Sequence, residues 1–101
     1  MKEKKLKGKL IHKEQEPDNL IEKSDFRRVA VILTSGFSER FEDEAYSISI
    51  SALRSINVRY GHLKANYFQV FTYVFPDGTE ETFWVINDYS EIVTMLLPIE
   101  Y

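Results

Sequence analysis

Residues 67–87 read YFQVFTYVFPDGTEETFWVIN, and this aromatic stretch decides the fold that we expect for the rest of the chain. At its centre, residues 75–79 (FPDGT) have the pattern of a tight turn, in which proline sets the first corner and glycine takes the left-handed position that closes the loop. A loop of this kind predicts a bulged β-hairpin with Phe75 opposite Thr79.

Counting outward from this turn assigns each strand residue a partner and a face, because successive side chains of a strand point to opposite sides. The predicted pairs on one face are Tyr73 with Glu81, Phe71 with Phe83, Gln69 with Val85, and Tyr67 with Asn87. The predicted pairs on the other face are Val74 with Glu80, Thr72 with Thr82, Val70 with Trp84, and Phe68 with Ile86.

The two faces of the hairpin have different compositions. The composition of the second face is typical of a hydrophobic core. The first face is aromatic, but some of its side chains end in a polar group, as Tyr73 does. Either a helix or the N-terminal strand covers this aromatic face, or it is an exposed platform for a partner. A homodimer closed by the same face is a further use of these residues.

Length and composition restrict the class of protein. The chain has 101 residues, which is enough for one domain, and we assign residues 1–101 to it with residues 1–4 and 99–101 loose. The absence of cysteine excludes disulfides and thiol catalysis. Because no stretch is apolar enough for a membrane span or a signal peptide, we expect a cytoplasmic protein with no membrane contact.

Charge is distributed unevenly along the chain. Residues 1–13 hold six lysines and one acid, whereas residues 14–44 hold nine acids and four bases. Alternation over residues 5–13 predicts an edge strand whose lysines prevent edge-to-edge pairing, with contacts to nucleic-acid phosphates as the functional alternative. Residues 17–19 (PDN) then predict a turn in the connector.

The middle of the chain predicts a buried strand followed by a helix. Residues 29–33 (VAVIL) form a continuous apolar run, which is typical of a central strand covered on both faces. In residues 38–56, apolar residues recur at helical spacing and form a stripe, which favours a helix with Ser38 as N-cap. Serine and isoleucine alternate over residues 47–51, so a strand is the alternative there. The stripe comprises Phe41, Ala45, Ile48, Ala52 and Ile56. Tyr46, Ile50 and Leu53 lie off it, which indicates deep burial or a second contact.

The C-terminal part predicts a second helix. Asp88 and Glu91 fit a capping box, apolar residues between 92 and 97 supply helical pairs, and Pro98 ends the element. The predicted order is therefore β-β-α-β-β-α, an α+β fold with an antiparallel sheet of about four strands and two helices.

No catalytic or metal-binding motif is present in the sequence. His12 and His62 stand 50 positions apart without a ligand pattern, and we expect no enzyme activity, metal or cofactor. We predict a small protein-interaction domain. It would be a regulator, inhibitor or accessory protein that acts on a larger protein partner. In one form of this hypothesis, its acidic residues mimic the phosphates of nucleic acid. The residues predicted to bind the partner are Tyr67, Phe71, Tyr73, Phe83, Glu39, Glu42 and Asp43. The alternative is single-stranded nucleic-acid binding by the N-terminal lysines and the aromatic face.

Overall fold

The hairpin forms the centre of the sheet and has the predicted register. The computed structural model describes residues 6–13, 23–24, 26–27, 29–60, 65–87 and 91–101. Every predicted pair from Phe68–Ile86 to Val74–Glu80 is present, and the Asn87 amide donates to the Tyr67 carbonyl at 2.9 Å. The turn is also as predicted, because Gly78 has a φ of 90° and its amide donates to the Phe75 carbonyl at 2.9 Å.

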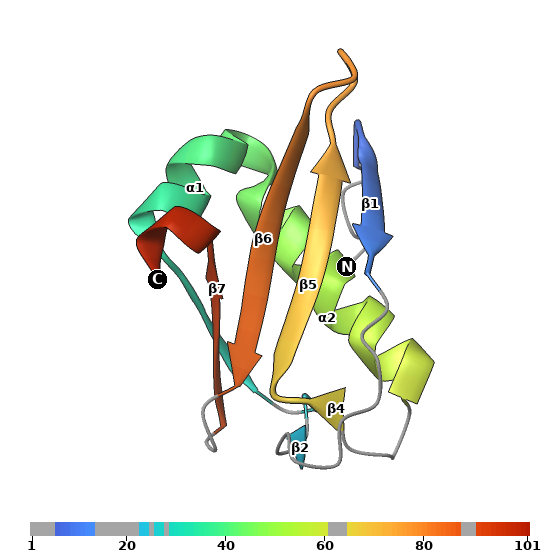
Figure 1. Ribbon diagram of the computed structural model, residues 1–101, viewed down its shortest axis with the longest axis vertical. Coiled ribbons are helices and arrows are strands. Elements are labelled where there is room, and N and C mark those ends of the chain that lie inside the picture. The colour runs from blue at the N-terminus through green and yellow to red at the C-terminus, as the bar shows by residue number, and fades with distance from the viewer. Residues whose placement is uncertain (1–5, 14–22, 25, 28, 61–64, 88–90) are drawn as a thin grey trace.

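The described part of the chain forms one long helix, shorter helical elements and two sheets (Figure 1). In chain order the elements are β1 (Lys9–His12), β2 (Lys23–Ser24), β3 (Ala30–Leu33), α1 (Ser35–Phe41), the 3-10 turn η1 (Glu42–Glu44), α2 (Ala45–Tyr60), β4 (Ala65–Asn66), β5 (Phe68–Val74), β6 (Glu80–Asn87), β7 (Ile92–Leu96) and the 3-10 turn η2 (Pro98–Glu100). The class is α+β, as expected.

Among the described residues, the main sheet has five strands in the order β1-β5-β6-β7-β3, and β2 and β4 form a separate pair. β1 is an edge strand, as predicted. The prediction of a central strand over residues 29–33 is wrong, because β3 is the opposite edge and runs parallel to β7. Its apolar composition reflects one face packed on the core and a second face that is partly exposed.

The prediction of a C-terminal helix is also wrong, because residues 92–96 form strand β7 between β6 and β3. Ile92, Val93 and Thr94 are β-branched, and burial alternates over the strand's first residues, with Val93 buried between more exposed neighbours. The predicted cap at Asp88 lies outside the described residues, as do the turn at 17–19 and His62.

The predicted helix is present, but it begins earlier and is interrupted. Thr34 caps α1 by accepting from the Phe37 amide, so Ser38 is not the N-cap. Glu42, the first residue of η1, has a φ of 51°, and this positive φ ends α1 before η1 and α2 continue. The helical stripe is confirmed, since all five of its residues are buried.

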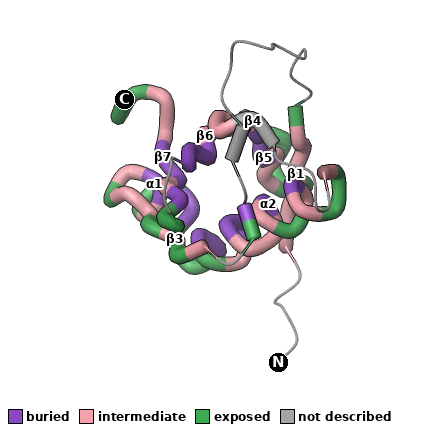
Figure 2. The backbone as a smooth tube through the Cα atoms, turned by 90° about the horizontal axis from the view of Figure 1, so that it is seen from below, coloured by how far each residue is buried: buried purple, intermediate pink, exposed green. Residues whose placement is uncertain are grey.

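Both helices lie on one face of the sheet, and the sheet curves around them (Figure 2). The buried side chains between the layers include Phe37, Phe41, Ile48, Ile56, Phe71, Tyr73, Phe83, Val85, Val93 and Met95. The core is therefore on the aromatic face of the hairpin.

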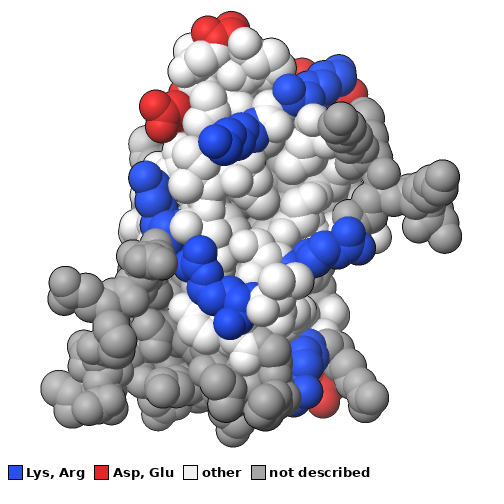
Figure 3. Space-filling model, turned by 90° about the vertical axis from the view of Figure 1, so that its right-hand side faces the viewer, with Lys and Arg blue, Asp and Glu red and all other residues white. Residues whose placement is uncertain are grey.

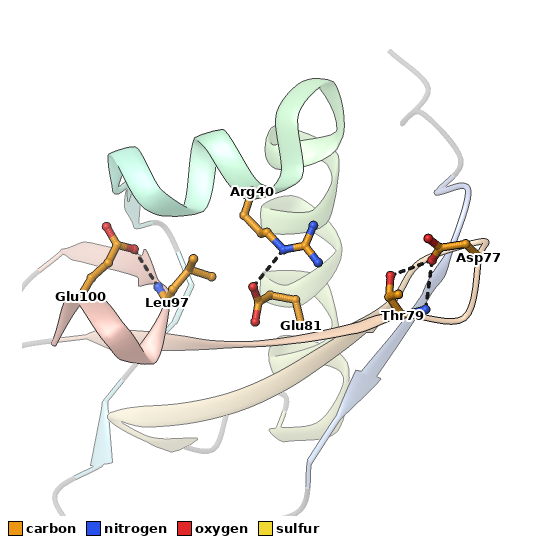
Figure 4. Close-up of polar contacts among 6 residues, drawn as sticks. All are labelled: Arg40, Asp77, Thr79, Glu81, Leu97 and Glu100. Atoms are coloured by element: carbon orange, nitrogen blue, oxygen red, sulfur yellow. Dashed lines mark hydrogen bonds and ion pairs between the residues drawn. The ribbon is translucent and has the colours of Figure 1, made fainter.

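The end of the described chain is attached to α1. Glu100 Oε1 accepts from the Leu97 amide at 2.9 Å (Figure 4). The same oxygen accepts from the Thr34 hydroxyl at 2.6 Å, and Oε2 accepts from the Gly36 amide at 3.1 Å. These bonds, led by the Thr34 hydroxyl, lower the pKa of Glu100. Of the residues expected to be loose, Glu100 is thus anchored, whereas Ile99 and Tyr101 are exposed.

Candidate functional site

The aromatic residues predicted to bind a partner are mostly in the core. Phe71, Tyr73 and Phe83 each have 0% of their surface exposed, and Tyr67 is half-buried. Phe41 of α1 packs edge-on against Tyr73 and Phe83 at centroid distances of 5.8 and 5.6 Å. The expectation of an exposed aromatic platform is therefore wrong, and the interpretation in which a helix covers this face is confirmed.

The acidic residues predicted to join that platform lie elsewhere. Glu39, Glu42 and Asp43 are exposed on α1 and η1, so the structure does not bring them together with the buried aromatic side chains. Their position leaves open a role in contacting a basic surface, separately from the hairpin.

A buried polar network explains why Tyr73 is in the core. Its hydroxyl donates to the Glu44 carboxylate at 3.2 Å and accepts from the Gly8 amide at 2.7 Å. Glu44 also accepts from the Lys7 amide at 3.0 Å. Burial raises the pKa of Tyr73, and the nearby Glu44 charge adds to this effect. The network joins the start of β1 to the junction of η1 and α2.

Ser55, His12 and Gln69 form a hydrogen-bonded chain across α2, β1 and β5. His12 Nε2 lies 2.7 Å from Gln69 Oε1, and Nδ1 lies 2.9 Å from Ser55 Oγ. Since Oε1 only accepts, Nε2 carries the proton and the neutral ring accepts from Ser55. Burial lowers the pKa of His12, the Gln69 bond opposes this, and the Arg59 charge lowers it further.

The order serine, histidine, acceptor is that of a hydrolytic triad, but two features that a triad needs for catalysis are absent here. Gln69 is neutral and gives no charge to stabilise an imidazolium ion. Ser55 lies inside α2, where backbone amides bond within the helix and cannot form an oxyanion hole beside it. The His12 ring also stacks on Phe71 at 4.2 Å. These features favour a structural role that attaches β1 to α2.

The opposite face of the sheet is the better candidate for a functional surface. No helix of the described chain covers it, although η2 and Tyr101 lie against part of it. Its apolar side chains come from five strands through the observed registers: Ile11, Phe68, Val70, Val74, Trp84, Ile86, Leu96, Ile92 and Ile32. We call this set the outer face.

Several outer-face residues are accessible to solvent. Ile32 is 50% exposed and Ile92 is 45% exposed, and they lie in adjacent rows of β3 and β7. Phe68 and Trp84 are half-buried, with ring centroids 4.9 Å apart. Trp84 also contacts Tyr101 edge-on at 5.5 Å. The sequence placed these residues on one face correctly, but the apolar content of both faces hid which of them is covered.

A pocket adjoins the outer face at the end near the hairpin turn. Its volume is about 440 Å³, and it is lined by Glu80, Glu81, Thr82, Leu97, Pro98 and Ile99. Glu81 is paired with Arg40 at 2.9 Å (Figure 4), whereas Glu80 has no partner among the described residues. The lining of the pocket therefore combines apolar side chains with an available carboxylate.

Positive charge gathers on the side of the molecule that carries β1 and α2 (Figure 3). Its exposed basic side chains include Lys7, Lys9 and Lys13 around β1 and Arg54 and Arg59 on α2. Lys9 lies on the outer face beside Val74, and Lys13 follows in the same alternation, where its amide donates to the Val70 carbonyl at 2.9 Å. The outer face is thus bordered by basic groups on its β1 side.

Within the described ranges, no group of three or more acidic, histidine or cysteine side chains is arranged to hold a metal ion. No helix in that part of the chain is long and apolar enough to cross a membrane. Comparison with protein-family models, with curated proteins and with solved structures found no match.

Proposed function

We propose that the protein is a non-enzymatic interaction domain that binds a larger protein partner through the outer face of its sheet. The observation that carries this proposal is the apolar surface formed by Phe68, Val70, Trp84, Ile92 and Ile32 on the side opposite the helices. Ile86 and Leu96 of the same face are buried, so the accessible part consists of the exposed Ile32 and Ile92 and the half-buried Phe68, Val70 and Trp84. Accessible apolar side chains that share one face mark interaction sites more often than isolated ones do.

The composition of the outer face supports a protein partner. Aromatic anchors such as Trp84 and Phe68 contribute most of the binding energy in many interfaces when they are desolvated. Thr82 adds a half-buried hydroxyl, which lies 3.2 Å from the hydroxyl of the buried Thr72. The pocket beside Glu80 favours a partner that presents a lysine or arginine at the rim.

A matched pair of lysine variants tests this proposal. Val70→Lys places a charge in the outer face, whereas Val58→Lys places one on α2, where Val58 is 79% exposed. Immobilised wild type and Val58→Lys should retain the same protein from a lysate of the source cell, and Val70→Lys should lose it at least tenfold. Equal retention by all three proteins would remove the outer face from the interaction.

The structure changes the basis of the nucleic-acid alternative. The predicted stacking residues Phe71, Tyr73 and Phe83 are buried and cannot contact a base. Phe68 and Trp84 instead share the outer face with Lys9 and Lys13, which is a pattern suited to single strands. This observation favours single-stranded nucleic acid as the second candidate ligand.

Trp84 offers a direct test of that second candidate, because it is the only tryptophan in the chain. Titration with a single-stranded oligonucleotide should quench its fluorescence, and binding should weaken as salt concentration rises. Val70→Lys should strengthen this binding while it abolishes capture of a protein, so the same variant separates the two functions.

A further inference from the structure

The outer side of β3 has backbone groups without strand partners. The Ala30 amide donates to the Glu91 carbonyl at 2.7 Å, and the Thr34 amide donates to the Met95 carbonyl at 3.1 Å. Because alternate residues of a parallel strand face the same neighbour, Val31 and Leu33 direct their N–H and C=O groups away from β7. No described strand lies on that side, so four hydrogen-bonding groups are available there.

The two edges of the sheet differ in their protection. β1 carries Lys9 within the strand and has Lys7 and Lys13 beside it, and such lysines discourage pairing with another strand. β3 has the sequence AVIL and no charge within the strand, and its nearest basic residues, Arg27 and Arg28, precede it in the sequence. An uncharged apolar edge is the kind that accepts an added strand.

One flank of α2 lies beside the chain that leads into β3, and this flank carries apolar side chains. Asn57 Nδ2 donates to the Phe26 carbonyl at 3.4 Å, which places this flank of the helix beside the chain that leads into β3. Tyr46, Ile50 and Leu53 precede Asn57 on the same flank at helical spacing. Tyr46 is 71% exposed, and Leu53 packs partly against the core. These residues are the second apolar arc of the helix noted in the sequence.

We propose that β3 pairs antiparallel with β3 of a second copy of this chain about a two-fold axis at Ile32. Val31 and Leu33 of one copy then exchange backbone hydrogen bonds with Leu33 and Val31 of the other. Ile32 meets its own counterpart on the outer face, and the two sheets become one sheet of ten strands.

A second copy fits this edge because the surface is self-complementary. The two-fold axis places only apolar side chains of β3 opposite one another, whereas the same pairing at β1 would oppose lysines, which is destabilising. A four-residue strand is small beside the roughly 800 Å² per partner that a standard interface buries. In the proposed dimer, the additional apolar area would come from the Tyr46–Leu53 flank of α2, where Tyr46 is 71% exposed.

Solution mass and one pair of variants test this dimer. Light scattering of the wild type should give twice the chain mass of 11.9 kDa. Ile32→Lys copies the protection seen on β1 and should weaken dimerisation at least tenfold, whereas Val58→Lys should leave the dimer intact. Thermal melting checks that each variant is folded, and Ile32→Thr offers a milder polar change at the same position.

Cross-linking tests the geometry without relying on a destabilised variant. The chain has no cysteine, so Ile32→Cys introduces a single thiol. Cα atoms opposed at this type of antiparallel position lie about 4.5 Å apart, which suits a disulfide between copies. Ile32→Cys should cross-link under mild oxidation, and Val58→Cys should not.

The opposing outcomes are distinct. A monomeric wild type, a dimer that persists in Ile32→Lys, or a dimer in which Ile32→Cys does not cross-link would each overturn the proposal. Val70→Lys should remain dimeric, so loss of partner binding in that variant concerns the outer face alone.

Discussion

The two faces of the hairpin are both rich in apolar side chains, yet they have different surroundings in the fold. On the inner face, Phe71 and Phe83 stack with ring centroids 5.4 Å apart and are fully buried under the helices. On the outer face, Phe68 and Trp84 pack at 4.9 Å and are half-buried. The comparison teaches that apolar content does not identify the covered face of a sheet. The position of the amphipathic helix identifies it.

The largest expected difference between the faces is in the cost of removing a ring. Phe83→Ala should lower the free energy of unfolding by about 3–5 kcal/mol, because it leaves a cavity in the core. Trp84→Ala should cost about 1–2 kcal/mol, roughly half as much, because water already reaches part of the indole. Chemical denaturation of both variants measures the difference. Equal costs would mean that the outer face is covered as fully as the inner one.

The polar network on the inner face should give the next largest effect. Tyr73→Phe keeps the ring but removes the hydroxyl that serves Gly8 and Glu44, so we expect a loss of about 1–3 kcal/mol. Tyr67→Phe is the control, since its hydroxyl has no hydrogen bond to the described residues, and should be nearly neutral. Similar melting temperatures for the two variants would contradict a stabilising network.

His12 should make the inner face sensitive to pH. Its pKa is lowered in the folded state by burial, so folding favours the neutral ring. Its contribution to stability is therefore complete above the ordinary value of about 6.5 and is lost as the pH falls through the folded pKa. Unfolding free energies from pH 7.5 to pH 5 measure this loss. His12→Gln should flatten the curve in that window.

The smallest effect is expected for the threonine pair on the outer face. Thr72→Val together with Thr82→Val removes both partners of one hydrogen bond and keeps the β-branched shape. Removing both partners leaves no unpaired group, so stability should change by less than about 1 kcal/mol. A loss as large as that of Tyr73→Phe would show that the two faces depend equally on polar contacts.

Local chemistry was sufficient to predict the hairpin. The turn residues fixed the register of β5 and β6, because a one-residue shift would have placed glycine outside the left-handed position. The helical stripe was also readable, since five apolar residues recur at steps of three and four, of which Phe41 ends α1 and the other four lie in α2.

Features that depend on distant partners were not predicted. The sequence of β7 suits a short helix or a strand, and its pairing with β6 and β3 decides between them. The apolar run of β3 was assigned to the centre of the sheet because composition alone does not report which strands are adjacent. The candidate surface was missed for the same reason, because its residues come from five strands.

The parallel pairing of β3 with β7 has a consequence for synthesis of the protein. β3 is made early, but the strand beside which it lies ends at Leu96, and the carboxylate that caps α1 belongs to Glu100. During translation, β3 therefore cannot form its pair with β7, its neighbour among the described strands, until residues 92–96 have left the ribosome. We expect a chaperone to bind β3 during this interval, because the strand is apolar and is exposed without its partner.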